Sequence, residues 1–192
     1  VREGANHLIL SDQNISESRA NVPMILAVGA INSNLVKHSL RGYASINVQT
    51  SEAMDTHSFA VLIGVGATTI NPYLAIDSIY QRYEKKLFGN LDFKTCVERF
   101  KKSINAGLLK IMSKMGISVL SSYRGGCNFE AVGLSRGLVA DFFPGMTSRI
   151  SGIGIYGIEK KIRELHFKAN QKNLVVLPIG GLYKYRKSGE EH

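Results

Sequence analysis

The chain has 192 residues, of which 44% are hydrophobic, and these values are typical of one globular domain with a buried core. It contains neither an apolar run of membrane-spanning length nor a signal-peptide pattern, so the sequence predicts neither membrane insertion nor secretion. Two cysteines, Cys96 and Cys127, are too few for a disulfide scaffold or a four-thiolate metal site, which favours a reducing, cytoplasmic location.

The formal net charge of +9 raises the question of a nucleic-acid partner, because clustered Lys and Arg neutralise phosphates. The basic residues are scattered over separate predicted helices and the end of the chain, so we interpret them mainly as solvated surface. Nucleic-acid binding is therefore the weakest functional alternative, and no such partner is predicted.

The first half of the chain alternates strand patterns with helix patterns. Pro23 and Pro72 stand at favoured first-turn positions of helices, and Asp55 or Thr56 is available as a helix cap. The expected order is strand 7–10, helix 23–42, strand 43–50, helix 55–63, strand 67–70 and helix 73–86.

The second half begins with a long amphipathic helix over residues 93–115, for which Asp92 is a suitable cap. Because glycine is unfavourable inside a helix, two helices meeting at Gly107 are the alternative to one continuous helix. The remaining expected elements are a β-branched strand 117–120, a helix 129–143, a strand 148–155, a helix 158–168 and a strand 174–178. Short strands alternating with helices predict an α/β fold with parallel strands, too few in number for a closed eight-stranded barrel.

Ligands and contacts collect at the carboxyl ends of parallel strands, so polar residues there are candidate site residues. Asp12 follows the first expected strand, Asn71 follows the third, and a polar turn over residues 121–126 follows the strand at 117–120. Because these ends share one edge of a parallel sheet, the three segments are expected to lie close together.

No catalytic set, cofactor-binding site or metal site is predicted from the residues. Gly152, Gly154 and Gly157 satisfy G-x-G-x-x-G, but the strand before them is weak and the acidic residue of a dinucleotide site is missing. We interpret these glycines as backbone hinges.

Several stretches carry a family resemblance in one consistent order: LILSDQ (8–13), VPMILAVGAINSNLV (22–36), HSFAVLIGVGATTINPYLA (57–75), KIMSKMGIS with SYRGG and NFEAVGLS (110–135), and SRISGIGI (148–155). Together they resemble the large subunit of glutamate synthase, in the part that joins its amidotransferase domain to its flavin domain. Cys127 stands where the family pattern usually has a glutamine.

The resemblance implies a central domain over residues 1–172, with a fold like a reduced (β/α) barrel, and a tail 173–192 similar to the start of the FMN-binding domain. It implies an intact enzyme that makes two glutamates from glutamine, 2-oxoglutarate and a reductant, using FMN and an iron–sulfur cluster that are bound elsewhere. The implied partners are the amidotransferase and FMN-binding domains of the same polypeptide, with a small reductase subunit or ferredoxin.

On this interpretation the chain is a non-catalytic piece cut from a longer protein, serving as interdomain scaffold and as part of the wall of an ammonia channel. Contact or channel candidates are Asp12, Asn71, Lys114, Tyr123, Arg124 and Gly125. Arg124 is expected to pair with a carboxylate or carbonyl of a neighbouring domain. The alternative is a free-standing α/β protein that binds a small molecule at residues 121–126.

Overall fold

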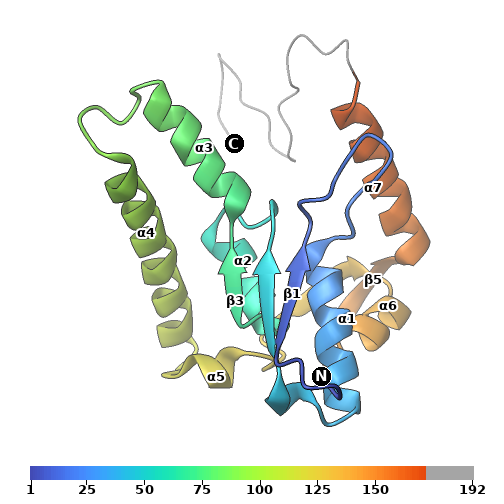
Figure 1. Cartoon of the computed structure of the whole chain (residues 1–192). Coiled ribbons are helices and arrows are strands. Elements are labelled where there is room, and N and C mark those ends of the chain that lie inside the picture. The colour runs from blue at the N-terminus through green and yellow to red at the C-terminus, as the bar shows by residue number, and fades with distance from the viewer. Residues whose placement is uncertain (172–192) are drawn as a thin grey trace, which may run out of the picture.

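A computed structural model describes residues 1–171 of the chain (Figure 1). Three parallel strands, β1 (His7–Ser11), β2 (Ser45–Gln49) and β3 (Thr69–Asn71), form one sheet in that order. A second sheet pairs β4 (Glu130–Leu134) with β5 (Thr147–Ile153), also in parallel. The fold is therefore mixed α/β with parallel strands, as predicted, and its small sheets do not close into a barrel. The expected strand at 174–178 lies outside the described residues.

Helices alternate with these strands. They are α1 (Met24–Lys37), α2 (Thr56–Gly64), α3 (Tyr73–Glu84), α4 (Phe93–Lys114), α5 (Leu120–Tyr123), α6 (Arg136–Phe142) and α7 (Ile155–Ala169), with a 3-10 turn at Arg41–Tyr43. Within the described residues no helix is long and apolar enough to cross a bilayer.

One face of the three-stranded sheet carries the core. Ile46 and Val48 of β2 are buried with Val28 of α1 and Leu62 of α2 in one cluster. Leu138 of α6 belongs to the same cluster, so the core joins the first sheet to the α6 region. Figure 1 shows α3 and α4 on one flank of this sheet and the β5, α6 and α7 group on the other.

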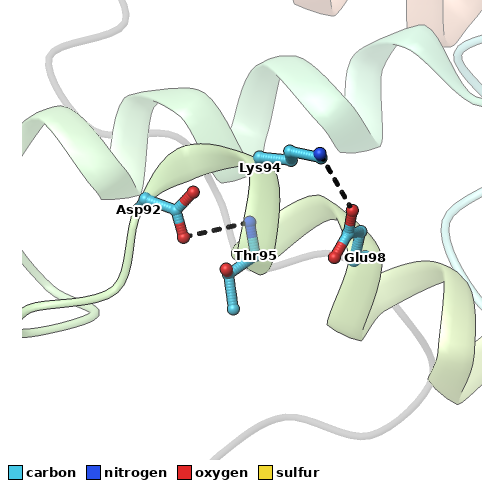
Figure 2. Close-up of polar contacts among 4 residues, drawn as sticks. All are labelled: Asp92, Lys94, Thr95 and Glu98. Carbon is cyan, nitrogen blue, oxygen red and sulfur yellow. Dashed lines mark hydrogen bonds and ion pairs between the residues drawn. The ribbon is translucent and has the colours of Figure 1, made fainter.

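Helix α4 begins as the sequence predicts. The Asp92 carboxylate accepts a hydrogen bond from the backbone N–H of Thr95 at 3.3 Å, and Lys94 and Glu98 form an exposed ion pair at 3.9 Å (Figure 2). Gly107 does not divide the helix, which is continuous. A Cβ atom at Gly107 would lie 2.5 Å from Thr56 Cγ2, so the glycine permits close packing of α4 on α2.

The strand expected at residues 117–120 is wrong. Gly116 has a φ of 70°, and the N–H of Ile117 donates to the Met112 carbonyl at 2.9 Å, which closes α4 in a Schellman-type turn. Ile117 then packs beside Met112 and Tyr123. These residues end one helix and lead directly into α5, so they do not pair with a strand.

The helix expected at 129–143 is also wrong in its first half. Gly133 has a φ of 78°, which is incompatible with a helix interior, and residues 130–134 pair with β5. Helix α6 begins only after Ser135, whose hydroxyl accepts from the Leu138 N–H at 3.2 Å. A Cβ atom at Gly152 would overlap the Gly133 backbone, so Gly152 serves the irregular β4–β5 pairing.

Asp92→Ala should lower the free energy of unfolding by more than a change at a neighbouring exposed position does, because it removes the N-cap of α4. Lys94→Ala is the matched control on the same turn and should change it by less than about 0.5 kcal/mol, since it breaks only an exposed ion pair. Urea denaturation of both variants checks this. Equal losses in the two variants would contradict the cap assignment.

Candidate functional site

The face of the three-stranded sheet opposite the core is polar. Strand alternation and the parallel register place the same-side residues of all three strands together: His7, Ile9, Ser11, Ser45, Asn47, Gln49, Thr69 and Asn71. Ile9 is the apolar member of this set and is 71% exposed. Parallel sheets are normally covered on both faces, so a solvent-facing polar one is unusual. We call this set the polar face.

Hydrogen bonds run across the polar face from strand to strand. Thr69 Oγ1 donates to Asn47 Oδ1 at 2.7 Å, and Asn47 Nδ2 donates to Ser45 Oγ at 3.1 Å. His7 Nδ1 lies 2.8 Å from the same Ser45 oxygen, and Ser11 Oγ donates to Gln49 Oε1 at 3.1 Å. The side chains are thereby held in place on the sheet while the surface stays polar.

Asp12 lies at the carboxyl end of β1 and is only 6% exposed. Its carboxylate accepts from Thr50 Oγ1 at 2.7 Å, from the Ser51 N–H at 2.9 Å and from Ser51 Oγ at 3.1 Å. Burial alone would raise the pKa of Asp12, but hydrogen bonding from Thr50, Ser51 and Tyr73 outweighs it and holds the pKa below its ordinary value. Asp12 therefore ties the ends of β1 and β2 together as a carboxylate.

Glu52 lies next to Asp12 and caps α1 from a distance. Pro23 precedes α1 and provides no side-chain cap, and the first turn of α1 contains no acidic residue. Glu52 Oε2 accepts from the Met24 N–H at 2.9 Å, and Oε1 accepts from Asn21 Nδ2 at 2.9 Å. Desolvation, together with the Asp12 charge, raises the pKa of Glu52 despite these bonds.

Two neighbouring carboxylates with opposite pKa shifts are a common arrangement for an acid and base pair. Here the oxygens of both groups are occupied by protein donors, and residues 1–171 contain no group of three His, Cys, Asp or Glu side chains that could hold a metal ion. The arrangement fixes the loop after β2 and the start of α1, so its role is to shape the end of the polar face.

The turn at residues 121–126 lies at the other end of the sheet. Arg124 lines a cavity of about 390 Å³ together with His7, Ser45 and Thr68, which stand where the three strands begin. Figure 1 likewise shows α5 on the side of the sheet where the strands start. The expected approach of Asp12, Asn71 and this turn is therefore wrong, because no strand precedes the turn.

The predicted residues thus do not form one site. Asp12 and Asn71 lie together at the carboxyl ends, where the Thr50 N–H donates to the Asn71 carbonyl at 3.0 Å. Lys114 is exposed in the last turn of α4.

The turn at residues 121–126 is packed against the fold. Tyr123 is 1% exposed, its hydroxyl has no partner among the described residues, and burial raises its pKa. Gly125 has a φ of 69° and donates its N–H to the Gly64 carbonyl at 2.9 Å.

Sequence reasoning missed Glu52, Thr50 and Asn47. The signal for Asn47 was present, because the expected second strand alternates polar with apolar residues and so predicts one polar face. Glu52 carried no local signal, since its partners Asn21 and Met24 are about thirty positions away in the sequence.

A family model described as glutamate synthase central domain matches residues 1–135. The chain belongs to this family. Similar relatives include the glutamate synthase [NADPH] large chains of Azospirillum brasilense (56% identical) and Bacillus subtilis (40% identical) and the ferredoxin-dependent glutamate synthase 2 of Synechocystis (38% identical). Each match covers 100% of this chain and 13% of the relative, so the chain spans about an eighth of their length.

The glutamate synthase central domain match ends just after β4, whose partner strand β5 lies beyond residue 135. All of the polar face and the Asp12 and Glu52 group lie inside the match. The residues that distinguish this site therefore belong to the family portion of the chain.

Asp12→Asn should destabilise the chain at neutral pH by about 1.5–3 kcal/mol, because it removes a buried, hydrogen-bonded charge. The lowered pKa of Asp12 means that its contribution is complete above the ordinary aspartate pKa and is lost as the pH falls through the folded-state value. The difference in unfolding free energy between the parent chain and the variant should therefore shrink in acid. Unfolding free energies of this variant and of the exposed control Asp141→Asn, measured across the acid range, check this; a constant deficit would contradict it.

Glu52→Ala should lower the free energy of unfolding by about 1 kcal/mol, because α1 loses its cap. Glu52→Gln should lower it by less at neutral pH, since the amide oxygen can still accept a hydrogen bond from the Met24 N–H. The raised pKa of Glu52 means that ionisation, as the pH rises through the folded-state value, opposes folding. Thermal unfolding of the two variants at neutral pH tests the assignment, and a larger loss in the glutamine variant would count against it.

Proposed function

We propose that this chain works as the central domain of a glutamate synthase large chain and holds an amidotransferase domain and an FMN-binding domain in fixed positions relative to each other. Its polar face would form part of the wall along which ammonia passes between them. The proposed overall reaction converts glutamine, 2-oxoglutarate and a reductant into two glutamates, in the cytoplasm. Either ferredoxin or a small reductase subunit would supply the electrons.

The observation that carries this proposal is the polar face itself. A parallel sheet buries both faces when it is complete within one domain, whereas here one face is hydrogen-bonded, polar and uncovered by any described element. Another domain could pack near such a face and still leave water between the two surfaces. Ammonia is polar, so a hydrophilic wall is compatible with its passage.

Exposed apolar side chains on the second sheet and α7 support the scaffold role. Val132 and Ile150 are register partners on the β4–β5 sheet, and both are more than 60% exposed. Tyr156, Leu165 and Phe167 of α7 are exposed as well, and α7 buries none of its residues. A neighbouring domain is the natural cover for such a surface.

FMN and the iron–sulfur cluster are assigned to other parts of the large chain. The two cysteines, Cys96 in α4 and Cys127 in the turn before β4, do not provide the ligand set that a cluster needs. On this proposal the described residues would position the neighbouring domains and enclose the ammonia path, and the redox chemistry would take place elsewhere in the large chain.

The test replaces the matching segment of the Azospirillum brasilense large chain with this chain. The chimera should form two glutamates for each glutamine consumed, with little release of free ammonia, which coupled enzyme assays measure. A chimera that folds and hydrolyses glutamine to glutamate but releases the ammonia, without forming a second glutamate from 2-oxoglutarate, would overturn the proposal.

Within that chimera, Asn47→Leu should increase free ammonia per glutamine hydrolysed while leaving glutamine hydrolysis itself unchanged, because it places an apolar group on the polar face. Lys94→Leu, on the exposed side of α4, is the control and should behave like the parent. Identical ammonia release from both variants would remove the polar face from the channel wall.

A further inference from the structure

Arg41 holds three segments together where the strands of the first sheet begin. Its Nε donates to Asn32 Oδ1 of α1 at 2.7 Å, its Nη1 to the Ala44 carbonyl at 2.7 Å, and its Nη2 to the Gly66 carbonyl at 2.8 Å. None of these acceptors is charged. The guanidinium is thus fixed in position while its positive charge stays unpaired within the described residues.

Arg124 brings a second guanidinium to the same place. Its Nε atom is buried and has no hydrogen-bond partner among residues 1–171, although a guanidinium presents five N–H donors. A buried donor without a hydrogen-bond partner destabilises the fold, and the effect is larger when the donor belongs to a charged group. Some acceptor is therefore expected at this position in the working protein.

The two guanidiniums line one cavity of about 390 Å³, whose other walls come from the strand starts and the turn at Arg41–Tyr43. No acidic side chain lines it. Desolvation and then the Arg124 charge lower the pKa of Arg41, which is the effect of two like charges held near one another. An anion in the cavity would offset both the repulsion and the missing acceptor.

We propose that the Arg41–Arg124 cavity is a carboxylate-binding site. Planar guanidiniums match the two oxygens of a carboxylate through paired N–H bonds. Phosphate sites instead usually use the amino terminus of a helix, and no α-helix begins among the residues that line this cavity. The source of the carboxylate rests on the proposed function: in a large chain, an Asp or Glu side chain of a neighbouring domain fills the cavity.

The first experiment uses the 192-residue chain alone, with sodium acetate titrated against sodium chloride at constant ionic strength. The Nε–H resonance of Arg124 should shift saturably in ¹H–¹⁵N spectra, and that of Arg41 should respond with the same Kd. Arg163 and Arg149 already face Glu159 and Glu130, so they are internal controls for nonspecific effects. A linear drift of Arg124 like that of Arg163 would overturn the proposal.

Arg124→Gln should weaken acetate binding at Arg41 at least about tenfold, which corresponds to about 1.4 kcal/mol. The same variant should not lower the melting temperature of the chain in acetate-free buffer, because the buried Nε donor of Arg124 has no partner there to lose. Arg99→Gln on the exposed side of α4 should leave acetate binding unchanged. A loss of stability in Arg124→Gln without acetate would mean that the arginine already has an internal partner, which contradicts the proposal.

A second arm identifies the source of the carboxylate in the chimeric large chain described above. A protein carboxylate should make acetate ineffective there and should make Arg124→Gln destabilising, opposite to its behaviour in the chain alone. Stabilisation of the chimera by acetate equal to that of the chain would show that the ligand is a free carboxylate and would overturn the domain contact. The first arm does not depend on the chimera, so a failed chimera and a failed carboxylate site give different results.

Discussion

A parallel sheet with one bare face is the constraint on which the rest of this structure depends. Helices α1 and α2 cover Ile46 and Val48 on one side, while the opposite side has hydrogen-bonding side chains from all three strands. Burial of one face supplies the hydrophobic stabilisation, and the side-chain network keeps the other face ordered without burial. A sheet built in this way is stable as part of a larger assembly and offers a polar surface to it.

The two ends of that sheet have opposite electrostatic character. At the carboxyl ends, Asp12 and Glu52 accept hydrogen bonds from the loop after β2, from Asn21 and from the first residue of α1, so both carboxyl groups have partners within the fold. At the amino ends, Arg41 and Arg124 have no acidic partner among the described residues. The carboxyl groups at the acidic end thus have hydrogen-bond partners within the fold, whereas the guanidiniums at the basic end lack an acidic partner among the described residues.

The sequence predicted the parallel α/β class and most of the first half well, because its elements follow simple rules. Asp55 accepts from the Ser58 N–H at 2.8 Å, as a cap should, and β2 shows the alternation read from its residues. The second half was harder, because Ile117 and Val119 have strand-like side chains in a segment whose backbone ends a helix. Gly133 and Ser135 mark the end of β4 and the start of α6, and the helix predicted at 129–143 wrongly ran through both.

The site was less predictable than the fold, because its contacts join residues far apart in the chain. Asp12 was predicted at a strand end, yet its partners Thr50 and Ser51 become neighbours only when β1 and β2 pair in register. The error in placing Arg124 follows directly from the false strand at residues 117–120, since the end of the sheet was inferred from that strand. One misassigned element thus moved a candidate residue from the amino ends of the strands to their carboxyl ends.

Packing also extends beyond the portion of the chain that matches the family model. Leu138, Val139 and Phe143 lie after residue 135, yet they belong to the same buried cluster as Val28 and Ile46. A Cβ atom at Gly29 of α1 would lie 2.5 Å from Phe143 Cε1, so α1 is shaped to receive the segment after α6. Ser33 of α1 reinforces this contact by donating to the Phe142 carbonyl at 3.1 Å. Removing residues after 135 would therefore expose one side of α1, which means that the first sheet depends on α6 for a closed core.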